Sequence, residues 1–379
     1  MSISEYASTD RQREVLDAVE EHGSQRSAAA ALGVHPSVVD RIMAGVRMRA
    51  AKAGHLPDHS IGSPVPEGHK LSGVSTLFDS DGQERMRWVK TTKDQAKIDA
   101  YYRGICESLG NDIKPLPAQP RKTHEGPTER LSVYPVTDLH IGADSSAGET
   151  GEEWGVDEAY VAFSRMLYEL TAGAQSGSQA LLVLMGDLLH ADNEAAVTPA
   201  HGNPLDVVGS YEDAAGMACD LIAQSVQRLA RKHKFVDVMV LPGNHDPIGM
   251  MMLKAAMRAF LANQNGVNVL DFDGVFGYYP YKNVLLGFHH GHTAKPADLP
   301  LIMSSDCSHD WARASDRCWF VGHKHTRFYQ DFPGCRVEGL RSAAAADAYA
   351  HRRGWRPHRE LVRIDFDDSR EIRRDRAVV

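Results

Sequence analysis

The chain has 379 residues, of which 42% are hydrophobic and 24% are charged, a composition typical of soluble globular proteins that excludes a wholly disordered chain. This length predicts two or three folding units rather than one. The net charge of -8 at pH 7 excludes a protein that binds polyanions through bulk positive charge, so any nucleic-acid contact has to come from a local surface.

The five cysteines are scattered along the chain and show no spacing typical of a metal site or a redox pair. Such cysteines are typical of a reduced, cytosolic protein. Residues 1–6 lack a positively charged region followed by an apolar stretch, and no later segment is apolar enough to span a bilayer. We therefore expect a cytoplasmic protein that makes no membrane contact.

A first helix, followed by two short helices around a tight turn, is predicted near the N-terminus. Thr9 and Gln12 form a capping-box signal at the start of the first helix, and Gly23 ends it. Residues 26–34 are rich in alanine and end in Leu-Gly-Val, and Pro36 suits the first turn of the next helix.

This helical segment resembles the DNA-binding helix-turn-helix. Ala29, Gly33 and the apolar pair Val39 and Ile42 stand at the offsets that let two short helices cross closely. The resemblance implies a recognition helix whose DNA-facing side chains are Ser37, Arg41 and Arg47. The acidic Asp40 on the same face leaves a second interpretation open, in which a small helical bundle binds protein or the catalytic domain.

Two linker-like segments enclose a predicted hairpin and helix. Residues 54–73 are rich in Gly, Pro, Ser and His. Strands are predicted over residues 74–78 and 83–91, followed by a helix over about residues 93–109 and a proline-marked linker. We therefore predict a helix-turn-helix domain over 1–54, a linker with hairpin and helix over 55–128, and a third domain over 129–379.

The third domain contains five short apolar runs separated by helical stretches. The runs are Leu131–Val136, Ala180–Met185, Val236–Leu241, Val284–Phe288 and Cys318–Val321. Runs of this length and composition predict the strands of an α/β sheet that is buried on both faces.

A polar cluster directly follows each apolar run. The clusters are Asp138-Leu139-His140, Gly186-Asp187, Gly243-Asn244-His245-Asp246, His290-Gly291-His292 and Gly322-His323-Lys324-His325. Because α/β sheets hold their sites at the carboxyl ends of strands, we expect the five clusters to converge. Imidazole, carboxylate and amide groups together suit manganese, iron or zinc rather than calcium.

In this order, the five clusters resemble the signature of calcineurin-like metallophosphoesterases over residues 131 to about 342. The resemblance implies an α/β fold in which a sandwich of sheets is flanked by helices, and a hydrolase that uses two divalent metal ions, with Mn²⁺ the expected metal. It assigns seven metal ligands, which are Asp138, His140, Asp187, Asn244, His290, His323 and His325. Asp187 is expected to bridge the two ions.

Three further residues are predicted to act in catalysis. His245 adjoins a metal ligand without being one, so we expect it to contact the phosphate and protonate the leaving oxygen. Asp246 either orients the His245 imidazole or caps the following helix. The stretch from Gly186 to His190 is similar to the corresponding motif of double-strand-break repair nucleases, which implies that His190 assists at the phosphate. His289 is expected to face away from the site.

The patterns together predict a metal-dependent phosphodiesterase, with a DNA nuclease or DNA-end-processing enzyme as the first hypothesis and DNA as the partner. A nucleotide or phosphoprotein phosphoesterase whose N-terminal module serves assembly is the second hypothesis, and a DNA-binding regulator with a vestigial hydrolase domain is the third. The combination of a helix-turn-helix with a phosphoesterase resembles proteins encoded by bacteriophages. Homo-oligomer formation is left open.

Overall fold

The computed structural model describes residues 6–52, 69–78, 84–93, 104, 113–118, 129–346, 348–354 and 358–379. The chain divides into two compact units, Met1–Arg103 and Gly104–Val379. The boundary that we expected near residue 128 lies C-terminal to this division. The segment 113–118 belongs to the second unit, where the Leu116 amide donates to the Phe260 carbonyl at 2.8 Å. The helix expected over about residues 93–109 lies outside the described residues, except for Lys93, which is the last residue of a strand, and position 104.

The first unit begins with three helices, as predicted. They are α1 (Asp10–His22), α2 (Gln25–Ala31) and α3 (Pro36–Lys52). The Thr9 hydroxyl accepts a hydrogen bond from the Gln12 amide at 3.3 Å, and Gly23 ends α1 with a left-handed φ of 71°. The N-terminal cap and the glycine stop inferred from the sequence are therefore confirmed.

The three helices share a small apolar core. Ala29 and Val39 are buried, Ile42 packs against the core, and Gly33 adopts a φ of 63° in the turn between α2 and α3. The left-handed backbone at this turn explains why glycine stands there. The helices and the tight turn are confirmed, whereas the relation to DNA-binding proteins stays a prediction.

The first unit also contains the predicted hairpin. Strands β1 (His69–Phe78) and β2 (Glu84–Lys93) pair antiparallel, with Val74 opposite Val89. The strands are longer than expected, and β1 includes residues that we assigned to a linker. The connecting turn and the side chains of Arg85 and Arg87 lie outside the described residues.

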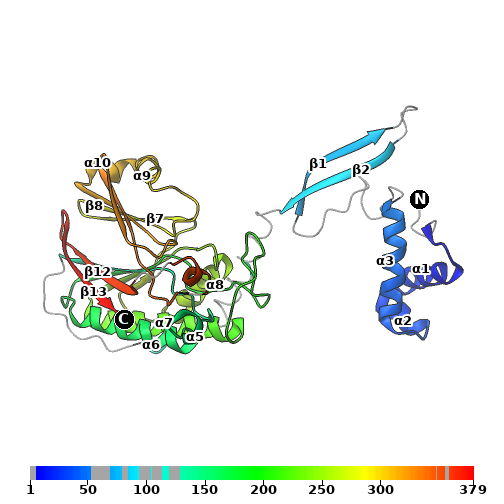
Figure 1. Cartoon of the computed structure of the whole chain (residues 1–379), viewed down its shortest axis with the longest axis horizontal. Coiled ribbons are helices and arrows are strands. Elements are labelled where there is room, and N and C mark those ends of the chain that lie inside the picture. The colour runs from blue at the N-terminus through cyan, green and yellow to red at the C-terminus, as the bar shows by residue number, and fades with distance from the viewer. Residues whose placement is uncertain are drawn as a thin grey trace. The chain divides into compact units, whose positions relative to one another are not determined.

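Two sheets form the centre of the second unit (Figure 1). The six-stranded sheet has the order β13-β12-β3-β4-β5-β6, and its strands are β3 (Leu131–Val136), β4 (Gln179–Leu184), β5 (Phe235–Val240), β6 (Val267–Val269), β12 (Glu360–Phe366) and β13 (Glu371–Val378). The five-stranded sheet has the order β10-β11-β9-β8-β7, and its strands are β7 (Phe276–Tyr281), β8 (Val284–His289), β9 (Asp316–Val321), β10 (Phe328–Phe332) and β11 (Cys335–Gly339).

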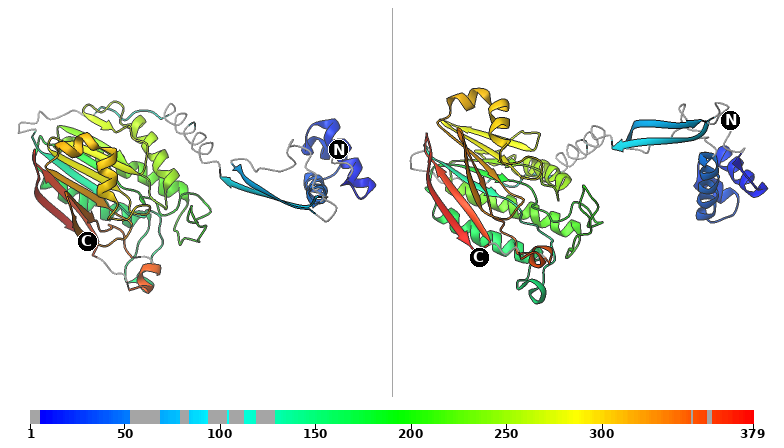
Figure 2. Two further views of the ribbon diagram at one scale, coloured as in Figure 1. Left: turned by 90° about the horizontal axis from the view of Figure 1, so that it is seen from above. Right: turned by 45° about the horizontal axis from the view of Figure 1, so that its top comes forward.

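Helices cover the outer faces of both sheets (Figures 1 and 2). The helices are α5 (Ala147–Thr150), α6 (Val156–Ala172), α7 (Tyr211–Lys232), α8 (Pro247–Phe260), α9 (Leu299–Asp306), α10 (Ser308–Arg313) and α11 (Ala348–Arg352). One core joins α6, α7 and α8 to the six-stranded sheet, a second lies between the sheets, and a third joins the five-stranded sheet to α9 and α10. The expected α/β sandwich flanked by helices is confirmed.

The five apolar runs form strands as expected, but they belong to two sheets rather than one. The strands β3, β4 and β5 lie side by side and parallel in the six-stranded sheet, and β8 and β9 are parallel neighbours in the five-stranded sheet. An apolar run is consistent with burial on both faces in either sheet, so the sequence pattern does not distinguish one sheet from two. None of the described helices combines the length and apolar character needed to cross a membrane.

Candidate metal centre

The candidate metal centre is built from short loops that leave five of the strands. Its seven expected ligands follow β3 (Asp138, His140), β4 (Asp187), β5 (Asn244), β8 (His290) and β9 (His323, His325). Five of them have a positive φ between 46° and 68°, namely Asp138, His140, Asp187, His323 and His325. A left-handed backbone is uncommon outside glycine and costs about 1 to 3 kcal/mol, so its repetition here indicates loops held in place for a function.

Three glycines allow the loops to approach one another closely. Position 186 requires glycine because its backbone φ is 87°, a left-handed conformation that other residues rarely adopt. At Gly243 and Gly322 the reason for glycine is space: a Cβ atom at Gly243 would lie 2.0 Å from Oδ1 of Asp187, and one at Gly322 would lie 1.9 Å from Oγ1 of Thr137. Any side chain at either position would push a ligand loop outward.

Asp138, His140 and His325 form the first group of ligand atoms. Nε2 of His325 lies 3.1 Å from Oδ1 of Asp138 and 3.3 Å from Nε2 of His140. The other carboxylate oxygen of Asp138 accepts hydrogen bonds from the Thr137 hydroxyl at 2.5 Å and from the His323 amide at 2.9 Å. These donors fix the carboxylate so that Oδ1 faces the two imidazoles.

Asp187, Asn244 and His290 form the second group. Nε2 of His290 lies 3.0 Å from Oδ2 of Asp187 and 3.0 Å from Oδ1 of Asn244. Nδ1 of the same ring donates to the Met185 carbonyl at 3.0 Å, which directs Nε2 toward the group. The ring of His323 completes the cluster, because one of its nitrogens lies within 4.8 Å of the ligand atoms of Asp187 and His290.

The two groups are coupled through their charges. Nε2 of His290 is 4.0 Å from Oδ1 of Asp138. Burial opposes the ionised carboxylate of Asp138, but the imidazoles of His325 and His290 hold its pKa below the ordinary value. Burial also opposes the charged imidazole of His290, but the carboxylates of Asp138 and Asp187 raise its pKa to about 9. Buried negative charge and imidazole nitrogens therefore converge on one region.

The donor set fits divalent transition-metal ions. Imidazole nitrogens, carboxylate oxygens and one amide oxygen point toward each other at short distances, which is the mixed nitrogen and oxygen environment that manganese, iron and zinc accept. The structure groups Asp187 with His290 and His323, while its Oδ1 accepts the His245 amide at 2.8 Å. The bridging role of Asp187 and the division of ligands between two ions stay predictions.

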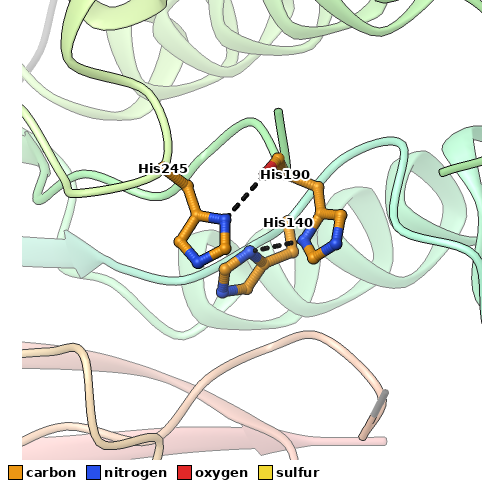
Figure 3. Close-up of side chains that lie close together, drawn as sticks. All are labelled: His140, His190 and His245. Atoms are coloured by element: carbon orange, nitrogen blue, oxygen red, sulfur yellow. Dashed lines mark hydrogen bonds between the residues drawn. The ribbon is translucent and has the colours of Figure 1, made fainter. Parts of the chain in front are cut away.

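The two expected catalytic histidines lie beside His140 (Figure 3). Nδ1 of His245 donates to the backbone carbonyl of His190 at 2.7 Å, and Nδ1 of His190 lies 3.1 Å from Nδ1 of His140. The rings of His190 and His245 are stacked, with centroids 5.3 Å apart. The structure thus brings both predicted catalytic histidines to the edge of the first ligand group.

Asp246 has a role that neither sequence interpretation gave. Its buried carboxylate accepts the backbone amides of Asp187 at 2.9 Å, Gly243 at 3.1 Å and Leu189 at 3.0 Å, and it makes no side-chain cap on α8. The loop after β4 and the loop after β5 are therefore tied together by one carboxylate. The His245 imidazole, which Asp246 was expected to orient, is held instead by the His190 carbonyl.

Asp192 caps α8 in place of Asp246, and the sequence analysis did not single it out. Its carboxylate accepts the amides of Ile248 at 3.0 Å and Gly249 at 2.7 Å. Burial raises the pKa of Asp192 to about 6. A capping residue that stands 57 residues before Gly249 in the chain leaves no local capping signal, so only the fold reveals it.

Two further histidines lie at the end of β8 and just beyond it. His289 is buried with its ring stacked on Phe276 at 4.8 Å, and its Nε2 lies 2.8 Å from the Thr293 hydroxyl, in agreement with a structural role. The ring of His292 is 5.3 Å from the ring of His290, so His292 lies beside the second ligand group.

The predicted DNA-facing residues lie on the first unit. Ser37 and Arg41 are exposed on α3, and Oγ of Ser37 is 2.9 Å from Nδ1 of His35. The side chain of Arg47 lies outside the described residues. Exposure is necessary for a recognition face, and the DNA-binding role itself stays a prediction.

The chain belongs to the calcineurin-like phosphoesterase family. Residues 131–351, more than half of the chain, match the model of that family. Membership implies a metal-dependent hydrolase whose fold binds two divalent metal ions. No curated protein sequence matches the chain.

Several solved structures are similar in fold. Vps29 from Entamoeba histolytica in complex with zinc is 14% identical over 65% of this chain and 98% of that chain, with a TM-score of 0.31. An archaeal phosphodiesterase is 10% identical over 66% and 99%, with a TM-score of 0.34. A dimetal phosphatase from Danio rerio is 9% identical over 64% and 98%, with a TM-score of 0.36.

Proposed function

We propose that the protein is a two-metal phosphodiesterase that hydrolyses DNA, as a nuclease or a DNA-end-processing enzyme. The observation that carries the proposal is the pair His190 and His245 beside a complete set of metal-ligand residues (Figure 3). The ligands alone support phosphoester hydrolysis, and the histidine pair adds groups that contact a phosphate and move a proton.

The seven ligands divide into two sets in this proposal. The first ion takes Asp138, His140, Asp187 and His325, and the second takes Asp187, Asn244, His290 and His323. Two divalent ions, when bound, polarise the phosphoryl group and neutralise the charge that develops on its oxygens. The nitrogen and oxygen donors suit Mn²⁺, which is the metal that we propose.

His245 is proposed to protonate the leaving oxygen. Because Nδ1 donates to the His190 carbonyl at 2.7 Å, the ring is fixed in orientation and Nε2 is available to the substrate. As water adds to phosphorus and the bond from phosphorus to the leaving oxygen breaks, Nε2–H gives its proton to that oxygen. General acid catalysis of this kind contributes about a hundredfold to ten-thousandfold to the rate.

His190 is proposed to contact the phosphate and to orient His140. Its ring is buried and lies beside both the ligand His140 and the proton donor His245, with ring centroids 5.2 Å and 5.3 Å away. With Nδ1 of His190 3.1 Å from Nδ1 of His140, one ring donates to the other and leaves Nε2 of His140 to face Asp138 and His325. In this proposal, His190 both orients the metal ligand His140 and contacts the phosphate of the substrate.

The N-terminal helices are proposed to bind duplex DNA. Arg41 and Ser37 are exposed on α3, and the apolar core on the other side of the helix holds α3 against α1 and α2. Arginine and serine side chains on a helix of this kind contact base edges and phosphates. Such a module raises the local concentration of DNA for a hydrolase on the same chain without changing the active site.

The test compares substrates with the full chain. Protein loaded with Mn²⁺ is assayed on single-stranded DNA, duplex DNA, cyclic nucleotides and an aryl phosphodiester. The proposal predicts cleavage of DNA. Hydrolysis of cyclic nucleotides without cleavage of DNA would replace it with a nucleotide phosphoesterase, and hydrolysis of none would indicate a vestigial domain.

The DNA-binding part is tested with Arg41→Glu. This change is expected to weaken duplex binding and its salt dependence while leaving hydrolysis of the aryl phosphodiester intact, because counterion release scales with phosphate contacts. Arg13→Glu, at an exposed arginine on α1, is the matched control. Equal DNA affinity of the Arg41→Glu variant and the unmodified chain would contradict a role for this face.

A further inference from the structure

A polar pocket lies between the five-stranded sheet and β13 of the six-stranded sheet, apart from the candidate metal centre. It has a volume of about 770 Å³ and is lined by residues from the start of β9, from β10 and β11, and from the turn into β13. None of the seven expected metal ligands lines it.

The pocket carries positive charge on an acidic protein. Four arginines and three carboxylates line it, so its net charge is +1, whereas the whole chain carries -8. The arginines are Arg327, Arg336, Arg370 and Arg374. Arginine is the side chain best shaped for phosphate, because its guanidinium offers several donors in one plane.

Two of the arginines hold the wall of the pocket. Arg374 donates to both carboxylate oxygens of the buried Glu338 and, through Nε, to Glu371 at 2.9 Å. Arg336 pairs with Asp316 and with Glu371. Each of the three carboxylates is therefore paired with Arg336, Arg374 or both, and this network of ion pairs fixes the shape of the pocket.

The other two arginines keep donors available. Nε of Arg327 lies 3.6 Å from Oε1 of Glu338, beyond good hydrogen-bond distance, and its side chain is 29% exposed. Arg370 is exposed, and its backbone amide donates to Oδ1 of Asp367 at 2.9 Å while its charge helps to lower the pKa of that carboxyl. Tyr329, with an exposed fraction of 57%, contributes an aromatic face to the same pocket.

We propose that this pocket binds a nucleotide, with its phosphate on Arg327 and Arg370 and its base against Tyr329. Guanidinium groups over a network of satisfied carboxylates attract an anion without leaving a buried charge unpaired. An aromatic ring binds any base through stacking, and the volume accommodates a mononucleotide. The site is independent of the proposed hydrolysis, since its residues differ from those of the metal centre.

The test measures binding of deoxyadenosine monophosphate to the full chain by calorimetry in chelator, where hydrolysis does not occur. Arg370→Glu is expected to weaken binding at least about tenfold, because it replaces a charge-assisted donor with a like charge. Tyr329→Ala is expected to weaken it as well. Arg376→Glu is the matched control, since Arg376 is exposed on β13 and does not line the pocket.

Three results would overturn the proposal. These are unchanged affinity in Arg370→Glu, an equal loss in Arg376→Glu, and equal affinity for inorganic phosphate and the nucleotide, which would remove the role of Tyr329. Asp187→Asn is expected to retain full nucleotide binding. Failure of the hydrolase assay therefore leaves this measurement unaffected, and loss of nucleotide binding leaves the proposed hydrolysis standing.

Discussion

Replacing the buried Asp192 by asparagine is expected to stabilise the protein near neutral pH. The carboxylate accepts two amides in the first turn of α8, but it is buried, and burial raises its pKa from 3.8 to about 6. The nearby carboxylate of Asp187 acts in the same direction. The ionised side chain is therefore held in the fold at a cost in free energy.

The sign and size follow from proton binding. Between pH 3.8 and about 6, the folded chain retains a proton on Asp192 that the unfolded chain has released. The free energy of unfolding therefore falls as pH rises through this window, by about 3 kcal/mol in total. Asparagine does not ionise, so Asp192→Asn lacks this slope. Both the amide and the protonated carboxyl offer one strong acceptor, so the two proteins should be similar near pH 4.

The assay is urea unfolding of the full chain in chelator at pH values from 4 to 7.5, with unfolding monitored by near-ultraviolet circular dichroism. Asp192→Asn is expected to match the unmodified protein near pH 4 and to exceed its stability by up to about 3 kcal/mol near pH 7. Asp220→Asn, at an exposed position on α7, should keep the original pH slope. A variant that is less stable than the unmodified protein at every pH would refute the reasoning from burial.

Three further changes test other parts of the site. His245→Ala should retain bound metal, measured by elemental analysis, and lose about a hundredfold to ten-thousandfold in rate; metal loss in parallel with activity would make His245 a ligand. Asp246→Ala leaves three buried amides without an acceptor and should cost about 3 to 9 kcal/mol in urea unfolding, at about 1 to 3 kcal/mol for each amide; an unchanged midpoint would contradict the tie between the loops. Gly322→Ala should lower metal affinity, because the new Cβ would meet Thr137 Oγ1 at 1.9 Å; titration showing full affinity would show that the β9 loop moves without consequence.

The sequence predicted those parts of the fold that depend on local signals. The Thr9 cap, the Gly23 stop and the Pro36 helix start lie within a few residues of the helices that they define. The five apolar runs form strands, and the carboxyl ends of parallel neighbours share one edge within each of the two sheets. The polar clusters that follow β3, β4 and β5 meet those that follow β8 and β9, as the contacts of Asp138 with His290 and His325 show. Local patterns of this kind can be recognised from a single amino-acid sequence.

The missed features depend on contacts between distant residues. Asp192 caps a helix that lies far from it in the sequence. Ser342 is also far from Asp138 in the sequence, and its hydroxyl donates to the Asp138 carbonyl at 2.6 Å. Asp246 was interpreted from its place between His245 and the following helix, but its carboxylate accepts the backbone amides of Leu189 and Asp187. The arginine pocket likewise joins β10, β11 and β13, which no short motif connects.

The most direct test of the account is metal-dependent hydrolysis by the full chain and by Asp187→Asn. The unmodified protein should hydrolyse an aryl phosphodiester and DNA with Mn²⁺ and lose both activities in chelator. Asp187→Asn should lose both activities and bind less metal, because its carboxylate faces His290 at 3.0 Å within the ligand cluster. Full hydrolysis in chelator, or an undiminished Asp187→Asn variant, would contradict the assignment of this cluster as the catalytic centre.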